Sequence, residues 1–153
     1  MSIFSRLLVS TLITASLSTL SVRAKADFLT GRDAAIHGDY ATAYNELLPL
    51  AENGHAASEG ILGAMYRDGL GVERSLPKAF FWTSQAAQHG QPVAEFELGR
   101  MYELGIGVET NAARALEWYS KSAAQGIVDG KVNIGFMYLK GAGIRQDYDK
   151  ARV

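Results

Sequence analysis

The stretch GHAASEGILGAMYRDGLGVERSLPKAFFWTSQAAQHG, residues 54–90, contains two blocks that occur again later in the chain. The copies of the first block are LGAMY at 62–66, LGRMY at 98–102 and IGFMY at 134–138. The copies of the second block are GLGV at 69–72, GIGV at 105–108 and GAGI at 141–144. Each copy follows the previous one by 36 residues. A fixed spacing of this length indicates a stack of structural repeats.

Each repeat has the sequence features of two helices joined by a turn. Leu62, Met65 and Tyr66 follow the i, i+3, i+4 spacing that gives a helix one buried face. Gly69 comes shortly after them and can adopt the left-handed conformation that ends a helix. A second helix is predicted from Ser75, because serine is a good N-cap residue. Good N-cap residues stand at the same phase elsewhere in the chain: Asp39, Asn111 and Asp147.

Glycine recurs in the middle of each first helix, at Gly63, Gly99 and Gly135. A glycine inside a helix costs about 1 kcal/mol relative to alanine, so its recurrence predicts that a neighbouring helix packs closely there. Trp82 and Trp118 recur in the second helices and are predicted to pack between hairpins rather than to form a ligand cage. The sequence therefore predicts an all-α protein, an α-solenoid of stacked helical hairpins with 36-residue repeats.

This pattern resembles the Sel-one-like (Sel1-like) repeat family, which is related to the tetratricopeptide repeat. The resemblance covers residues 54–153 and rests on these features: the Leu-Gly-x-Met-Tyr block, the Gly-x-Gly-Val turn, the Lys78-Ala79 and Arg114-Ala115 steps, the recurring tryptophan, and a closing Ala-Ala-x-x-Gly. Members of the family are mostly adaptor and scaffold proteins, so the resemblance implies binding of a protein or peptide rather than catalysis. Some cysteine-rich members are associated with binding or hydrolysing β-lactams, which gives a weak cell-wall-related hydrolase as the alternative. This chain departs from those members because it has no cysteine.

The first 26 residues have the parts of a secretory signal peptide. Arg6 precedes an apolar run over 7–22, and Ala24-Lys25-Ala26 is a small-x-small cleavage motif. The run is shorter and richer in Ser and Thr than the about 20 apolar residues of a membrane span. We therefore predict cleavage after Ala26, a periplasmic or secreted location, and no stable membrane span after cleavage, with an uncleaved anchor as the alternative.

The repeats divide the chain into five segments: 1–26, the signal peptide; 27–53, a divergent first hairpin; 54–89, the first repeat; 90–125, the second; and 126–153, a truncated third. The divergent hairpin lacks the Gly-x-Gly turn, and Gly38-Asp39 is predicted to make a tighter link. Terminal repeats of solenoids are expected to be atypical because one of their faces meets water. Pro49 should kink the second helix of this hairpin or remove one of its backbone hydrogen bonds.

Composition and spacing argue against several kinds of chemistry. The net charge is −1, or −4 for the 127 residues after residue 26, which offers no electrostatic basis for nucleic-acid binding. Without cysteine there is no disulfide and no thiolate metal site. Gly69 and Gly71 follow a helix rather than a strand, so they are predicted to form a turn and not a phosphate-binding loop.

The remaining polar residues suggest no catalytic, metal or cofactor site. Ser84 and Ser120 have no histidine at a spacing that suggests a nucleophile and its base. The histidines have no helical pairing with one another and are predicted to lie in loops or at helix ends: His37, His55 and His89. Five glutamates are predicted to lie on solvated faces: Glu46, Glu52, Glu59, Glu95 and Glu97.

The helical phase also predicts a binding surface. With Leu62 facing the core, the opposite side of each first helix should line the inner, concave wall of the solenoid, which is the usual binding surface. In the first repeat this side carries Ala57, Gly60, Ala64, Arg67 and Asp68, which offer little to a partner. In the later repeats the aromatic and arginine side chains there are of the kinds that interfaces favour. The predicted partner-binding residues are Phe96, Arg100, Glu103, Phe136, Leu139 and Lys140, with packing between hairpins as the alternative role of Phe96.

Overall fold

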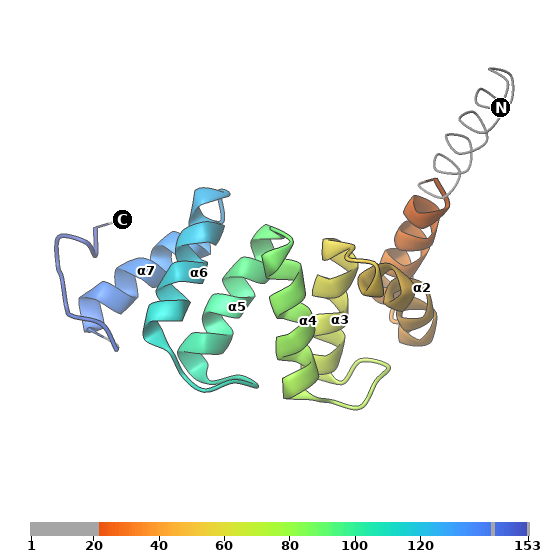
Figure 1. Ribbon diagram of the computed structural model, residues 1–153, viewed down its shortest axis with the longest axis horizontal. Coiled ribbons are helices and arrows are strands. Elements are labelled where there is room, and N and C mark those ends of the chain that lie inside the picture. Colours follow the sequence, from red (N-terminus) through yellow and green to blue (C-terminus); the bar gives the residue numbers. More distant parts are fainter. Residues whose placement is uncertain (1–21, 142, 153) are drawn as a thin grey trace, which may run out of the picture.

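The computed structural model describes residues 22–141 and 143–152 (Figure 1). Most of the predicted signal peptide, residues 1–26, therefore lies outside the described residues. Every regular element in the described part is a helix, and none of these helices is long and apolar enough to cross a membrane. A helix over residues 22–36 is followed by α2 (Tyr40–Glu52), α3 (Ala56–Asp68), α4 (Leu76–Gln88), α5 (Pro92–Leu104), α6 (Ala112–Ala124) and α7 (Val128–Lys140).

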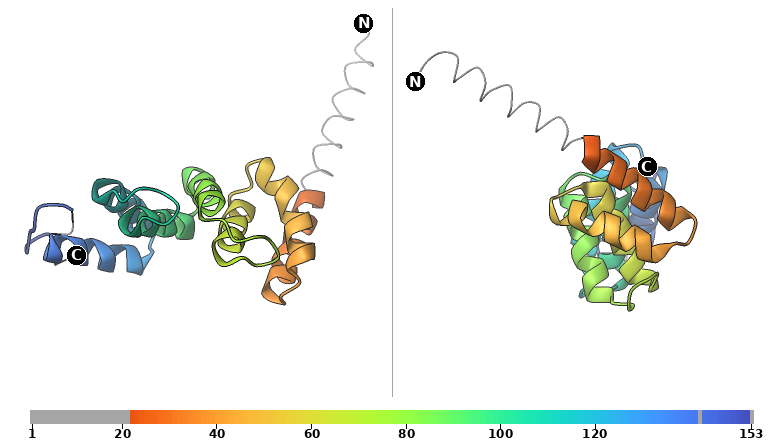
Figure 2. Two further views of the ribbon diagram at one scale, coloured as in Figure 1. Left: turned by 90° about the horizontal axis from the view of Figure 1, so that it is seen from below. Right: turned by 90° about the vertical axis from the view of Figure 1, so that its right-hand side faces the viewer.

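The helices form a row of stacked hairpins, which confirms the predicted α-solenoid. Each of α2 to α7 has 13 residues, and corresponding helices begin 36 residues apart. The helices pair most extensively as α3 with α4 and α5 with α6, and each hairpin packs against the next. The molecule is elongated, with the helix over 22–36 and α7 at opposite ends (Figures 1 and 2).

Capping residues that the sequence predicted stand at the starts of α2, α4 and α6. By contrast, α7 starts after Ile127 without a side-chain cap, and the described residues after Asp147 form a turn rather than the predicted second helix. Asp39, Ser75 and Asn111 each accept a hydrogen bond from the backbone N–H three residues later, and Asp147 accepts one from Lys150 N at 3.0 Å. This satisfies one of the free amides of the first turn. The first helices end on glycines in the left-handed region: Gly69, Gly105 and Gly141, with φ of 72°, 72° and 66°.

The buried residues form several clusters along the row rather than one central core. The largest cluster joins α4, α5, α6 and α7 around the fully buried Tyr119 and Leu98. A second cluster joins α2 and α3 around Leu47 and Leu62. Trp82 and Trp118 are partly buried and pack against these clusters, in agreement with their predicted packing role. Stability in such a structure is the sum of the contacts within each hairpin and the contacts between neighbouring hairpins.

Two of the mid-helix glycines, Gly63 and Gly99, lie directly against the second helix of their hairpin. A Cβ at Gly63 would lie 2.5 Å from Thr83 Oγ1 and 3.1 Å from Thr83 N. A Cβ at Gly99 would lie 2.6 Å from Cδ1 of the Tyr119 ring. Both distances are far inside van der Waals contact, so the close approach that the sequence predicted at these two glycines is confirmed.

A basic side chain lies over a tyrosine ring in each of the three repeats. The basic residue stands three positions after the predicted N-cap of the second helix, and the tyrosine is the last residue of the recurring Leu-Gly-x-Met-Tyr block. The distances to the ring centroid are 5.1 Å for Lys78 and Tyr66, 5.4 Å for Arg114 and Tyr102, and 5.4 Å for Lys150 and Tyr138. Such cation–π contacts contribute about 0.5–1 kcal/mol each at exposed sites. In each of the three repeats the contact joins the first helix to the residues that follow the turn.

The first hairpin keeps the packing of the others with a shorter connection. Its link covers three residues (37–39), against seven (69–75) in the next hairpin. Gly31 stands five residues before the end of its helix, as Gly63 does, and a Cβ there would lie 2.7 Å from Leu47 Cγ. The following helix, α2, contains Pro49 in its last turn and continues past it to Glu52.

Two of the glutamates that were expected on solvated faces are buried, so that prediction was wrong for Glu59 and Glu95. Their exposed fractions are only 2% and 5%. Glu59 Oε2 lies 2.8 Å from His89 Nδ1, and Glu95 Oε2 accepts a hydrogen bond from Gln125 Nε2 at 2.8 Å. An antiparallel hairpin places the start of its first helix beside the end of its second, which brings together residues that are 30 positions apart.

Candidate functional site

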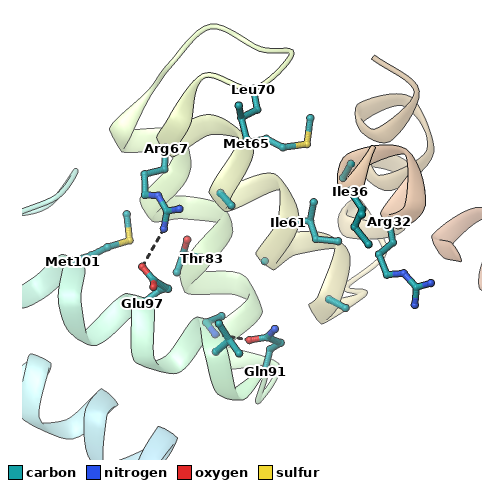
Figure 3. A pocket seen from close by; sticks show the side chains of 16 residues that line it. Arg32, Ile36, Ile61, Met65, Arg67, Leu70, Thr83, Gln91, Glu97 and Met101 are labelled. Carbon is teal, nitrogen blue, oxygen red and sulfur yellow. Dashed lines mark hydrogen bonds and ion pairs between the residues drawn. The ribbon is translucent and has the colours of Figure 1, made fainter. Parts of the chain in front are cut away.

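A groove on the face predicted to be the inner wall of the solenoid is lined mainly by the first helices of three consecutive hairpins, and we call it the inner groove. These are the helix over 22–36, α3 and α5 (Figure 3). The groove has a volume of about 500 Å³. Its apolar lining includes Ile36, Ile61, Leu70, Val93 and Met101, and polar side chains at its edge include Arg32, Arg67, Gln91 and Glu97.

Small residues on α3 create much of this space. Ala57, Gly60 and Ala64 follow one another at helical spacing on the wall of the groove. Gly60 differs from Gly63, because a Cβ added at Gly60 would meet its nearest atoms at the ordinary distances of 3.8 and 3.9 Å. Packing therefore does not require a glycine at position 60, and its effect is to leave the groove open.

An ion-pair network joins α3 to α5 across the groove. Arg67 donates to Glu97 Oε2 at 3.1 Å (Figure 3). Arg67 also donates to Asp68 at 2.8 Å, and Arg100 donates to Glu97 Oε1 at 3.2 Å. The hydrogen bond from Arg67 holds the pKa of Asp68 below its ordinary value, and the same bond raises the pKa of Arg67. The network fixes the spacing of the two helices that form the groove, and it leaves Glu97 about one quarter exposed.

The other polar residues around the groove have local partners. Gln91 is the N-cap of α5 and accepts a hydrogen bond from Ala94 N through its Oε1 atom. Arg32 donates to Asp33 at 2.7 Å on its own helix. The apolar floor is therefore bordered by side chains that are already held in place, so a ligand would meet a preformed surface.

The structure separates the predicted binding residues into two groups. Phe96 is partly buried and packs on Tyr119 with a centroid distance of 5.6 Å, and Glu103 accepts a hydrogen bond from Tyr119 Oη at 2.6 Å. Arg100 takes part in the network around Glu97. These three residues are thus engaged with their own hairpin. The contact of Phe96 with Tyr119 lies within the α5–α6 hairpin, whereas the alternative role had placed its ring between hairpins.

The second group is exposed on α7. Phe136 and Leu139 have exposed fractions of 51% and 45%, and Lys140 Nζ lies 5.7 Å from the centroid of the Phe136 ring. Phe136 and Leu139 border a separate groove of about 710 Å³ with Tyr148 and Ala151 of the segment that follows α7, and Lys140 is not among its lining residues. The two groups do not line a common groove among the described residues.

One serine–histidine pair occurs that sequence analysis did not anticipate. His55 Nδ1 lies 2.8 Å from Ser58 Oγ and also accepts a hydrogen bond from Ser58 N at 3.3 Å. His55 is the N-cap of α3, and the side chain of Ser58 is fully buried. The pair therefore caps a helix and is closed to a substrate. The described part of the chain contains no group of three His, Cys, Asp or Glu residues arranged to hold a metal ion.

Sequence analysis placed Arg67 and the small residues of α3 on the inner wall but did not identify the groove they form. It assigned Glu97 to a solvated face, and the structure shows this carboxylate bridging two arginines on the groove's edge. The available signal was the contrast between repeats: Gly60 and Ala64 are small where Phe96 and Arg100 stand 36 residues later.

The family model for the Sel1 repeat matches three successive segments, residues 56–91, 92–127 and 128–152. These segments begin at the first residues of α3, α5 and α7. No curated protein matches the chain.

Two solved structures are similar to this chain over most of its length. One is a Sel1 repeat protein from Oxalobacter formigenes, with a TM-score of 0.75, 31% identity, and coverage of 82% of this chain and 50% of that chain. Another is c5321, a protective antigen present in uropathogenic Escherichia coli strains displaying an SLR fold, with a TM-score of 0.79, 32% identity, and coverage of 92% and 31%. The chain thus spans at most half the length of either structure. With three matched repeats and these two relatives, the chain belongs to the Sel1 repeat family.

Proposed function

We propose that this chain is an exported protein-interaction module whose inner groove binds an extended peptide segment of a partner protein. Sel1 repeat proteins are generally protein-interaction modules, and their helical scaffold is typically non-enzymatic. The observation that carries the proposal is the preformed groove between the helix over 22–36, α3 and α5. The concave face of a helical solenoid is the surface on which extended ligands bind.

The lining of the groove favours a segment with a bulky apolar side chain. Ile61, Met65 and Val93 offer apolar contacts, and Gly60 and Ala64 leave room for the incoming group. Burial of apolar area contributes about 25 cal/mol per Å², so one leucine or phenylalanine side chain would supply much of the affinity. The partly exposed Glu97 at the edge can accept hydrogen bonds from the backbone of the bound segment.

The sequence-predicted surface extends the proposal along the array. Arg100 forms an ion pair with Glu97, which lines the groove. Further along the array, Phe136, Leu139 and Lys140 are exposed on α7. A segment that leaves the groove over Arg100 would have these residues as a second, weaker contact area. We therefore treat the α7 residues as the extension and the groove as the principal site.

Export rests on the order of residues in the first 26 positions. Cleavage after Ala26 is compatible with the packing of the first hairpin, because Phe28 is retained and its ring lies 4.6 Å from that of His55. The exposed Arg23–Asp27 ion pair at 3.8 Å would be lost, and exposed pairs of this kind contribute little to stability.

The test is selection of peptides from a random display library on the purified full chain. Selected peptides should share a bulky apolar residue, and their affinity should fall at least tenfold when the groove is filled by Gly60→Leu or Ala64→Leu. The matched control is Ala113→Leu, which makes the same change as Ala64→Leu at an exposed position of α6. Circular dichroism of each variant verifies the fold.

The second pair of variants separates the two parts of the surface. Phe136→Ala and Arg100→Glu should each weaken binding by a few fold if the peptide continues onto α7. Full binding by the folded groove variants, with loss in Phe136→Ala alone, would move the principal site to α7. Failure of the wild-type chain to enrich any peptide would contradict the proposed function itself.

A further inference from the structure

A smaller pocket lies away from the inner groove, between the end of α2, the start of α3 and one side of α4. Its volume is about 480 Å³, and it shares no lining residue with the inner groove. The lining residues are Ala51, Glu52, Gly54, Glu59, Phe81, Trp82, Gln85 and His89.

The lining combines an aromatic wall with carboxylates. The rings of Phe81 and Trp82 meet edge to face with centroids 5.0 Å apart, and Phe81 is 51% exposed. Glu52 is exposed at the rim, whereas Glu59 is 2% exposed and is held by His89. No lysine or arginine is among the lining residues. An aromatic face beside carboxylates is the environment that attracts an organic cation.

The next hairpin shows what such a position holds. Trp118 stands 36 residues after Trp82, and Lys121 stands 36 residues after Gln85. Lys121 Nζ lies 3.9 Å from the centroid of the Trp118 ring and 2.8 Å from Glu117 Oε1. In the second repeat the chain therefore places its own primary ammonium group over the tryptophan.

The first repeat lacks this internal cation but keeps the features that would bind one. Gln85 is neutral, and Phe81 replaces the glutamate that pairs with Lys121. Negative charge comes instead from Glu52 of the preceding hairpin and from Glu59, whose counterpart in the second repeat is Glu95. The pocket thus presents a tryptophan and two carboxylates without an ammonium group among its lining residues.

We propose that this pocket binds a primary alkylammonium group from outside the chain, placed over Trp82 and paired with the exposed Glu52. The group can be carried by a lysine side chain of a protein or by a small alkylamine. This site is independent of the inner groove, so it can be present whether or not the groove binds peptides.

The experiment is a fluorescence titration of the full chain carrying Trp118→Phe, in which Trp82 is the only remaining tryptophan. The two cationic probes are Nα-acetyl-lysine methylamide and pentylammonium, and the neutral probe is Nα-acetyl-norleucine methylamide. We expect a saturable change with the cationic probes that weakens with added salt, and none with the neutral one. Tighter binding of the capped lysine would identify a protein side chain as the ligand, and tighter binding of pentylammonium a small amine.

Two variants test the placement of the group. Gln85→Lys reproduces the arrangement of the second repeat, so its own ammonium should lower probe affinity at least tenfold. Glu52→Gln removes an exposed carboxylate and should lower affinity about two- to fivefold, as expected for an exposed ion pair. Glu117→Gln, in the next hairpin, is the matched control and should have no effect. The proposal is overturned if the cationic probes give no saturable response, if the neutral probe responds equally, or if affinity is unchanged in Gln85→Lys.

Discussion

Alanine substitution at two glycines of the same helix should have opposite effects on stability. Gly60 and Gly63 both lie inside α3, so alanine at either position gains about 1 kcal/mol of helix propensity. At Gly60 the new methyl group meets its neighbours at ordinary distances, 3.8 Å or more. Gly60→Ala should therefore raise the free energy of unfolding by up to about 1 kcal/mol.

At Gly63 the same methyl group has no room. It would lie 2.5 Å from Thr83 Oγ1 and 3.1 Å from Thr83 N, and the second of these is a backbone atom that cannot rotate away. Overpacking of this kind costs about 1–3 kcal/mol, which offsets or exceeds the propensity gain of about 1 kcal/mol. The two variants should therefore differ in unfolding free energy by about 1–3 kcal/mol.

The assay is thermal unfolding followed by far-UV circular dichroism. In a domain of this size, 1 kcal/mol corresponds to about 4 °C in Tm, so Gly60→Ala should melt about 4–12 °C above Gly63→Ala. Gly63→Leu, which adds more bulk at the same contact, should be less stable than Gly63→Ala. If Gly63→Ala melts at or above Gly60→Ala, the close contact between α3 and α4 does not limit stability, and the explanation given for the mid-helix glycines is wrong.

Three further predictions concern single interactions and the chain start. Burial and the hydrogen bond to Glu103 raise the pKa of Tyr119 above its ordinary value of 10.0. The folded state therefore keeps this contribution to its stability at a pH below 10.0 and loses it as the pH rises above that value. Denaturant titrations at rising alkaline pH should therefore show stability falling less in Tyr119→Phe than in wild type. Asn111→Ala removes the N-cap of α6 and should lower the unfolding free energy by about 0.5–2 kcal/mol, whereas Asn111→Asp should be close to neutral in the same assay. N-terminal sequencing of the exported protein should begin at Asp27, and an intact residue 1 in a membrane fraction would contradict cleavage.

The sequence was sufficient to predict the fold, because each helix, turn and capping signal occurs in more than one repeat. A single Leu-Gly-x-Met-Tyr block would be a modest signal for a helix. Three blocks at a spacing of 36 residues, each followed by a glycine turn and an N-cap residue, leave few alternatives to stacked hairpins. The mid-helix glycines Gly63 and Gly99 also gave a correct packing prediction, because the cost of a glycine in a helix has to be offset by a close neighbour.

The functional surfaces were harder to predict because they depend on which residues meet across hairpins. Helical phase placed Phe96 on the inner face but could not show that its ring would turn onto Tyr119. Burial of Glu59 depends on a histidine 30 residues away at the end of the partner helix. Contacts of this kind are set by the crossing of two helices, and the periodicity of one helix does not contain that information.

The differences between repeats explain where the two proposed binding sites lie. Residues at the stacking positions must meet the same neighbours in every hairpin, and they stay alike: leucine or isoleucine at position 62 and its copies, and tyrosine under a basic side chain in all three. Inner-face positions have no such requirement, and Gly60 and Ala64 become Phe96 and Arg100 in the next repeat. The larger pair would fill the space that the smaller pair leaves open, so the groove forms beside α3. The same reasoning applies to the pocket beside Trp82, where Gln85 stands in place of the lysine that covers Trp118. In an array whose stacking contacts repeat, a residue that departs from the pattern is not required for stacking and is available to contact a ligand.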